Sequence, residues 1–418
     1  MVQAPEEEQY PFYRWVVIGL VYAYAEANSL VTISIGVLLP LMRQELLFGP
    51  VESGWLGSAR YLASGALALP LGVLLVRYNP RWVFLISTVL GGMCTIILGW
   101  APVYPIVLFG LFASTVGFVG AQPALALLRI QWFPRRELGR VLGVGLALGS
   151  IGQGLAVALT PFIVASMGSW RGAFYVYAAA TLAVAVAWAI LGRDRITPEY
   201  RAAMHTREAR APIRSIFRYR EIMLIGGTWW GNLVAWAAMF TFWPTFLLEN
   251  RGIPLTTAGI LMGLFPIGSA FSTVFTGFLS DKIGLRRPMI WPAALIEPVF
   301  YLAMLLPLPV EALGAAAFIT GCLSYAPLPA LQTIPYEIRG IKPSEVAIGS
   351  TFISMITMWG GVAGPMIASA IYALTGSLVL ALVVTSFFPL TLAAGGFLLP
   401  ETGPRRRRVE EAGVLVRS

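Results

Sequence analysis

Apolar residues in the 418-residue chain gather in long continuous runs separated by short polar segments. A helix needs about 20 mainly apolar residues to cross the hydrocarbon core of a bilayer. Because the runs are continuous rather than alternating, a closed β-barrel is excluded. The pattern predicts an all-α polytopic membrane protein with twelve transmembrane helices, at residues 15–40, 53–76, 82–101, 104–128, 141–166, 172–192, 221–248, 256–280, 288–307, 310–334, 345–373 and 377–399.

Composition agrees with this class. Hydrophobic residues make up 57% of the chain and charged residues only 12%, against about 25% charged in soluble proteins. Cys94 and Cys322 lie in apolar runs and His205 is the single histidine, which excludes a disulfide framework and a His/Cys metal centre. We find no catalytic constellation and no phosphate-binding loop, so we expect no enzyme. The N-terminus has no basic segment or cleavage site, so we expect no removed signal peptide.

The net charge is +9, and the positions of the basic residues on this topology indicate how the chain is oriented in the membrane. If both termini are cytoplasmic, 24 of the 29 Lys and Arg residues lie on the inner side, and only Arg43, Arg171 and Arg251 lie in outer loops. This asymmetry is the positive-inside signal. We therefore expect a multi-pass protein of the cell membrane with cytoplasmic N- and C-termini. Contact with anionic lipid headgroups accounts for the excess, and no nucleic-acid partner is expected.

The two halves of the chain repeat each other at an offset of about 205 residues: Gly54 matches Gly259, and Gly72 matches Gly277. Six apolar runs precede a segment with eight arginines, and six follow it. This predicts two pseudo-symmetric six-helix bundles. The expected parts are an N-terminal bundle 1–192, a cytoplasmic basic linker 193–220, a C-terminal bundle 221–399 and a cytoplasmic Arg-rich tail 400–418. A regulatory partner site is the alternative role for the linker.

The turn Gly-Phe-Leu-Ser-Asp-Lys-Ile-Gly-Leu-Arg-Arg at residues 277–287 resembles the signature loop of the major facilitator superfamily. The resemblance implies secondary transport by alternating access, with this loop as a cytoplasmic latch of the outward-open state. The first-half copy carries Val76 in place of the acid. Residues expected to serve in gating are Gly277, Asp281, Lys282, Gly284, Arg286, Arg77 and Arg129. For Arg129, snorkelling to headgroups is the alternative.

Two further segments, 132–140 and 168–174, are similar to the monocarboxylate, oxalate/formate and organic-anion branches of that superfamily. This resemblance implies a small, carboxylate-like organic anion as substrate, moved by proton-coupled symport or by anion antiport. No cofactor is expected beyond a proton gradient or a counter-substrate, and we expect a monomer. A proton-driven multidrug or metabolite exporter is one alternative. A non-transporting membrane sensor or assembly protein is another.

Four ionisable residues fall within predicted spans, where a charge costs from about 3 to over 10 kcal/mol: Glu26, Arg60, Arg129 and Glu297. At 1.5 Å per residue, Glu26 lies about 17 Å deep and Arg60 about 11 Å from the outer side, so the two share a depth on neighbouring helices. We expect that they can pair, with Glu26 as proton-coupling site and Arg60 as anion site. A static ion pair that only fixes helix packing is the alternative. The role of Glu297 stays open.

The family resemblance also implies a cavity lined from both halves. Polar and aromatic residues expected to bind substrate there, besides Arg60, are Tyr22, Asn28, Gln122, Trp229, Asn232, Trp236, Tyr325 and Trp359. Of these, Trp229, Asn232 and Trp236 follow a spacing that puts them on one helix face. A small-residue spacing that predicts close helix packing recurs in the fifth span, at Gly145, Gly149, Gly152 and Gly154, and in the eleventh, at Gly360, Gly364 and Pro365.

Overall fold

The computed structural model describes residues 12–75, 77–195, 217–338 and 340–403, and its regular elements there are helices. The first half contains α1 (Arg14–Ile33), α2 (Ile35–Leu46), α3 (Pro50–Leu75), α4 (Pro80–Trp100), α5 (Tyr104–Trp132), α6 (Arg135–Met167) and α7 (Trp170–Leu191). The second half contains α9 (Arg220–Arg251), α10 (Leu255–Ile283), the 3₁₀ turn η2 (Arg287–Met289), α11 (Trp291–Ala303), α12 (Val310–Tyr325), α13 (Leu328–Glu337), α14 (Pro343–Thr375), α15 (Leu378–Thr385) and α16 (Leu390–Leu398).

Eleven of the twelve predicted spans are long and apolar enough to cross a membrane in the described part of the chain. The twelfth, predicted at 288–307, is the shorter helix α11. Three spans are each made of two helices: α1 with α2, α12 with α13, and α15 with α16. Proline explains the second break, because Pro327 has no N–H to continue the helix. The prediction of an all-α membrane protein is confirmed.

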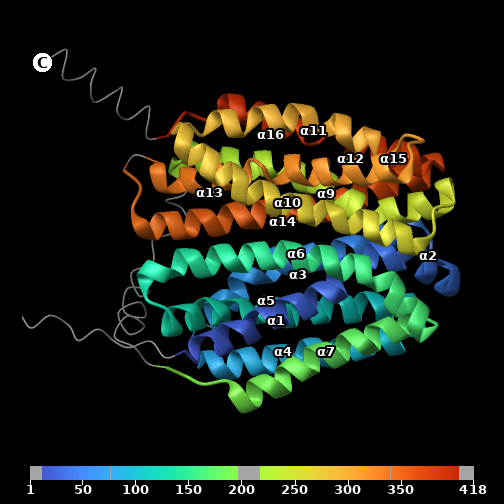
Figure 1. Ribbon diagram of the computed structural model, residues 1–418, viewed down its shortest axis with the longest axis horizontal. Coiled ribbons are helices and arrows are strands. Elements are labelled where there is room, and N and C mark those ends of the chain that lie inside the picture. Colours follow the sequence, from blue (N-terminus) through green and yellow to red (C-terminus); the bar gives the residue numbers. More distant parts are fainter. Residues whose placement is uncertain (1–11, 76, 196–216, 339, 404–418) are drawn as a thin grey trace, which may run out of the picture.

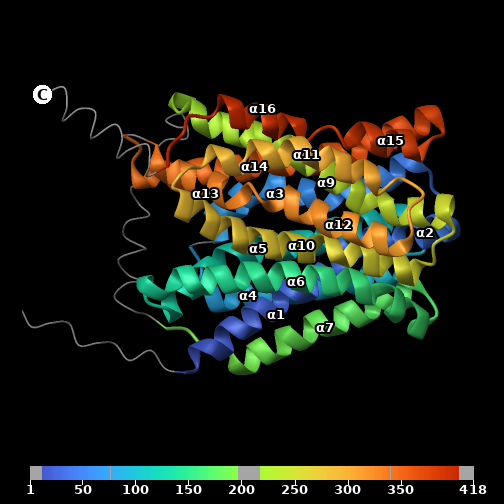
Figure 2. The ribbon, with the colours of Figure 1, turned by 45° about the horizontal axis from the view of Figure 1, so that its top comes forward.

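The helices form two bundles that follow the two halves of the sequence. Figures 1 and 2 show α1, α4, α5 and α7 on one side of the molecule and α11, α12, α15 and α16 on the other. Where the bundles meet, α3 packs against α14 and α6 packs against α10. Since α3 and α6 correspond to α10 and α14 in the repeat, these two contacts are pseudo-symmetric. Most of the predicted linker and tail, residues 196–216 and 404–418, lies outside the described residues.

The bundles meet tightly at the end that carries the loop before α3. There Leu56, Val157 and Phe265 are fully buried. The backbones of α6 and α10 approach so closely that a Cβ on Gly154 would lie 2.6 Å from the carbonyl oxygen of Gly263. Small residues permit such close crossings in lipid. We call this end the closed end.

An ion pair crosses between the bundles at the closed end. Arg43 of α2 donates to Glu249 of α9 at 3.4 Å, and its guanidinium also lies 5.7 Å from the ring centre of Tyr372 of α14. A residue of the first half thus contacts two helices of the second half at this end.

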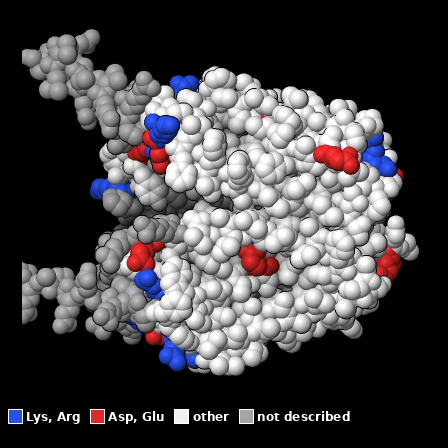
Figure 3. Space-filling model, in the orientation of Figure 1, with Lys and Arg blue, Asp and Glu red and all other residues white. Residues whose placement is uncertain are grey.

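The bundles separate toward the opposite end, which carries Arg81 in the first turn of α4 and Arg286 after α10. We call this end the basic end. Near this end, Val73 of α3 and Phe278 of α10 are 42% and 75% exposed. A Cβ on Gly143 of α6 would have no neighbour within 4 Å. Figure 3 shows a hollow between the two lobes at this end. The conformation is therefore closed at one end and open at the basic end.

Candidate functional site

Arg60 lies on α3 at the interface between the two bundles. Together with Thr32 and Tyr61 of the first half and Phe240 and Thr241 of the second, it lines a small cavity. Its guanidinium lies 4.3 Å from the ring centre of Tyr61 and donates a hydrogen bond to the Tyr61 hydroxyl. Among the described residues no carboxylate forms an ion pair with Arg60. A cation thus faces a cavity that both halves build, without an acidic partner.

Glu26 lies on α1 and faces α6 instead of Arg60. A Cβ on Gly152 of α6 would overlap the Glu26 carboxylate, and Gly149 lies one turn away on the same face. The Oε2 atom of Glu26 is buried and has no hydrogen-bond partner. The expected pairing of Glu26 with Arg60 does not occur in this conformation. Equal depth in the bilayer does not fix the direction of a side chain: Glu26 points to α6, whereas Arg60 folds onto Tyr61 of its own helix.

Tyr22, one turn before Glu26, extends this polar face of α1 toward the basic end. Its hydroxyl donates to the carbonyl oxygen of Val141 at 2.5 Å, and its ring packs on Gly145. The guanidinium of Arg129 from α5 lies 6.0 Å from the Tyr22 ring centre. Arg129 therefore contacts an aromatic ring inside the first bundle, which differs from simple snorkelling. Three of the α6 glycines predicted to pack closely, at positions 145, 149 and 152, pack against α1, and Gly154 packs against α10.

The aromatic residues expected on α9 form a cluster with α10 and α12. Trp236 stacks on Phe265 at 4.2 Å and on Phe240 at 5.1 Å, and it lies 4.8 Å from Tyr325. Trp229 meets Tyr325 edge-on at 6.0 Å. Trp236 is 4% exposed, so in this conformation its indole is part of the packed core.

Asn232 lies on the same side of α9 as Trp236 but does not face the cavity. Its Nδ2 donates to the carbonyl oxygen of Ser324 at 3.1 Å, and its side chain is buried. The predicted common face of α9 is confirmed. In this conformation the Asn232 side chain contacts the last turn of α12.

Three predicted substrate residues stand apart from these groups. Gln122 and Trp359 are exposed, and Asn28 is half-buried. Trp359 packs near Gly65 of α3 through its indole edge. Sequence reasoning missed Tyr61. Consecutive residues on a helix do not normally face each other, and only the long side chain of Arg60 folding back brings the two together.

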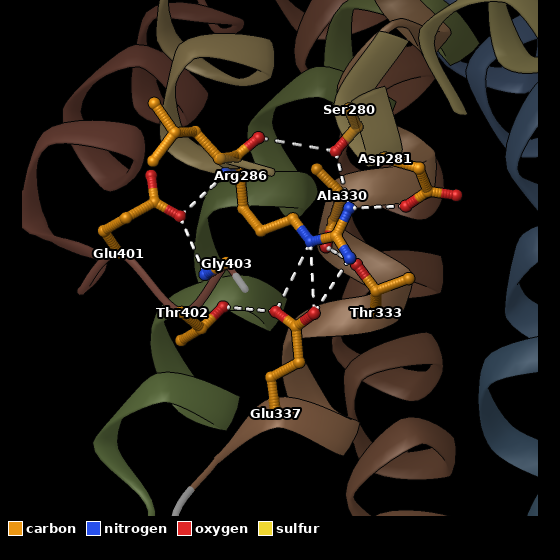
Figure 4. A network of polar contacts seen from close by, with 10 residues as sticks. Ser280, Asp281, Arg286, Ala330, Thr333, Glu337, Glu401, Thr402 and Gly403 are labelled. Atoms are coloured by element: carbon orange, nitrogen blue, oxygen red, sulfur yellow. Dashed lines mark hydrogen bonds and ion pairs between the residues drawn. The ribbon is translucent and has the colours of Figure 1, made fainter. Parts of the chain in front are cut away.

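The predicted gating loop forms a polar network within the second bundle (Figure 4). Arg286 donates to Asp281 at 2.9 Å, to Glu337 of α13 at 2.8 Å and to Ser280 at 2.7 Å. Its own backbone N–H donates to Glu401 beyond α16 at 2.7 Å. Burial acts to lower the pKa of Arg286, but the hydrogen bonds and charges of Glu337 and Asp281 outweigh it and raise the pKa.

The remaining loop residues have separate positions. Gly284 ends α10 in a left-handed conformation with φ of 69°, as a tight turn requires. Lys282 and Arg77 are exposed, and Gly277 has only Pro329 of its own bundle nearby. In the described residues, the loop thus joins α10, α13 and the end of α16, and its polar contacts stay within one half.

Two repeated bundles, closed at one end and lining a central cavity from both sides, define the class of the major facilitator carriers. The family model described as Major Facilitator Superfamily matches residues 21–334 and 228–417. The chain belongs to this superfamily, whose members are membrane transporters and not enzymes. The resemblance of the 277–287 loop is thereby confirmed.

Curated relatives carry transporter names. The chain is 28% identical to a "Probable hexose phosphate transport protein" of Chlamydia pneumoniae, over 65% of each chain. It is 25% identical to the "Probable nitrate/nitrite antiporter NarK1" of Thermus thermophilus, over 62% of this chain and 60% of the relative. It is also 25% identical to the "Probable sulfoacetate transporter SauU" of Cupriavidus necator, over 61% and 62%. The match thus spans slightly less than two thirds of these relatives.

Solved structures confirm the fold. A bacterial homolog of the human lysosomal transporter Spinster, in an inward-facing and unoccupied conformation, superposes with a TM-score of 0.77 at 18% identity. The match covers 93% of this chain and 97% of that one. At this identity the likeness concerns the fold alone.

Proposed function

We propose that this transporter moves a small organic anion, carboxylate-like in charge and size, and that Arg60 binds it. The observation that carries the proposal is the position of Arg60, which faces a cavity built by both halves without an acidic partner. A cation within a membrane span is costly, and such residues usually face an ion or substrate path. An anion from solution would supply the missing counter-charge.

The surroundings of Arg60 support an anion with a small apolar body. The planar guanidinium offers several donors in a fork that matches a carboxylate. The Tyr61 hydroxyl accepts a hydrogen bond from one of these donors, and an entering anion would take the place of this hydroxyl. Phe240 and Thr241 line the same cavity from the second half. A bound anion would thus contact both halves, which gives it different affinities for the open and closed arrangements.

Glu26 is our candidate for proton coupling. Its Oε2 atom is buried without a partner beside the glycine face of α6, a setting that favours the neutral, protonated acid. Both Glu26 and Arg60 belong to the first half. We infer that the anion enters when Glu26 is protonated, because an ionised Glu26 would compete for the positive field of Arg60. Proton symport and anion exchange are both consistent with this coupling.

The sidedness follows from the charges. The basic end carries most of the Lys and Arg residues, so we place it in the cytoplasm by the positive-inside rule. The conformation then opens to the cytoplasm and is closed on the outside by the α3–α14 and α6–α10 contacts. The cell membrane remains the proposed location.

Transport into liposomes tests the proposal. The purified full chain would be reconstituted and challenged with labelled lactate, oxalate, nitrate, sulfoacetate and a sugar phosphate, with and without a pH gradient. We expect uptake of at least one carboxylate or sulfonate that Arg60→Gln abolishes. Arg193→Gln removes the charge of an exposed arginine and serves as the matched control. Transport of cationic or neutral drugs that survives Arg60→Gln would favour the exporter, and no flux at all would favour the sensor.

A further inference from the structure

Glu297 lies in the middle of α11 and is completely buried within the second bundle. Its Oε1 accepts a hydrogen bond from the Ser324 hydroxyl of α12 at 2.5 Å. Tyr301, one turn further along α11, places its hydroxyl 3.4 Å from the same Ser324 oxygen. The other carboxyl oxygen of Glu297, Oε2, has no hydrogen-bond partner. In the described residues no Lys or Arg forms an ion pair with Glu297.

A second buried acceptor without a partner lies on Asn232 of α9, close to the break between α12 and α13. Helix α12 ends at Tyr325 and α13 begins at Leu328, so the chain is irregular directly after Tyr325, and Ser324 lies in the last turn of α12. Asn232 of α9 covers this break by donating its Nδ2 to the Ser324 carbonyl. The Oδ1 atom of Asn232 is buried without a partner, like Oε2 of Glu297. Leaving a buried polar group unpaired costs about 1–3 kcal/mol, and more if the group is charged.

Two buried acceptors in this group of side chains, Oε2 of Glu297 and Oδ1 of Asn232, thus have no donor. A proton on Glu297 removes the buried charge. It also turns one carboxylate oxygen from a hydrogen-bond acceptor into a donor. A metal ion fits less well. The described residues contain no group of three or more His, Cys, Asp or Glu side chains that could hold a metal ion.

The titratable groups around Glu297 do not supply an alternative charge. Tyr301 lies on its own helix, and Tyr325 lies beyond it on α12. Helix α16, which packs against α11, carries no ionisable side chain. Arg287 of η2 is turned to the carbonyl oxygens of Gly396 and Phe397.

Glu297 and Ser324 lie behind a layer of aromatic rings at the interface between the halves, which we call the aromatic wall and which contains Phe265 and Trp236. Tyr301 meets Phe265 edge-on at 6.0 Å, and Phe265 stacks on Trp236. Tyr325 follows Ser324 in the chain and contacts the same indole. Rocking of the halves that moves this wall or the α12–α13 break would give the Glu297 group access to water. Broken helices near the bilayer midplane serve as ion or proton sites in other transporter folds.

We propose that Glu297, Ser324 and Asn232 form a second proton-binding site, separate from Glu26, which is loaded in this conformation and exchanges its proton during the transport cycle. The exchange is a plain proton transfer to and from water, with no other co-reactant. Only the exchange step rests on the proposed transport function, because the bound proton itself is a property of this conformation.

Infrared spectroscopy of the full chain in lipid nanodiscs tests the site without any transport. We expect wild type at neutral pH to show a protonated-carboxyl C=O band that Glu297→Gln loses and Glu26→Gln retains. In Ser324→Ala the band should shift, because the acid loses a hydrogen bond. The band should also decrease as the bulk pH is raised. Glu297→Gln keeps the size and shape of the side chain, and Ser324→Ala provides the same test if the first variant does not fold.

Several outcomes would overturn the proposal. Identical acid bands in wild type and Glu297→Gln would mean that Glu297 is ionised. A band that Na⁺ removes at constant pH would assign the site to a metal cation. A band that no pH change alters in the folded chain would make Glu297 a static buried acid. An absence of anion flux in liposomes would reject the proposed function while leaving the band assignment intact, so the two failures are distinguishable.

Discussion

Glu26 on α1 and Gly152 on α6 lie so close that a methyl group on the glycine would overlap the carboxylate. The Glu26 side chain therefore packs directly against the α6 backbone at this glycine. Overpacking at such a contact typically costs about 1–3 kcal/mol.

Gly152→Ala should consequently destabilise the chain and impair proton-driven uptake, because the Glu26 carboxylate must move. The matched control is Gly143→Ala on the same helix, where a Cβ has open space and where alanine gains about 1 kcal/mol of helix propensity. Thermal unfolding of both variants in detergent would check this. Equal melting temperatures for the two variants would contradict the packing that we describe.

The ion pair between Arg43 and Glu249 should hold the closed end together. Both side chains are partly exposed, and such pairs contribute about 0.2–1 kcal/mol. Glu249→Gln should therefore shift the balance toward separation at this end by at most about fivefold, because 1.4 kcal/mol corresponds to a factor of ten.

Spin labels at Leu47 and Leu374, two exposed positions at the closed end, would report this shift as a larger population of long distances. Arg171→Gln is the control, since Arg171 pairs with Glu45 inside the first half. If both variants gave the wild-type distance distribution, the pair would have no role in closure.

The network around Arg286 should stabilise the second bundle unequally through its two acids. Glu337 is 16% exposed and Asp281 is 74% exposed. Removing one partner of a buried pair costs on the order of 3 kcal/mol, whereas an exposed pair contributes less than about 1 kcal/mol. Glu337→Gln should therefore lower the melting temperature much more than Asp281→Asn. The opposite order would show that Asp281 contributes more than Glu337 to the stability of the network.

The sequence was sufficient for most of the fold because membrane spans are encoded in long apolar runs. It did not predict the break at Ser34, where the serine hydroxyl lies 2.6 Å from Thr160 of α6. That contact depends on a residue far along the chain. The break at Pro327 has a local cause, but its closure by Asn232 also requires a distant helix.

For the site, the sequence identified the costly charges but not their neighbours. Glu26 and Arg60 stand out because ionisable residues are rare in lipid. Which way each points depends on helix rotation, which depth alone does not determine. Tyr61 shows the same limit, since its contact with Arg60 depends on a side-chain conformation. Asn232 was expected at the cavity, and its hydrogen bond to the Ser324 carbonyl depends on a helix far along the chain.

The central claim is that Arg60 binds an anion, and the most direct test is ligand-induced stabilisation of the purified full chain. A ligand at about 100 times its Kd should stabilise the folded state by about 2.7 kcal/mol. We predict that the anion transported in liposomes raises the melting temperature of wild type and of Arg193→Gln but not that of Arg60→Gln. An equal rise in Arg60→Gln would contradict the account.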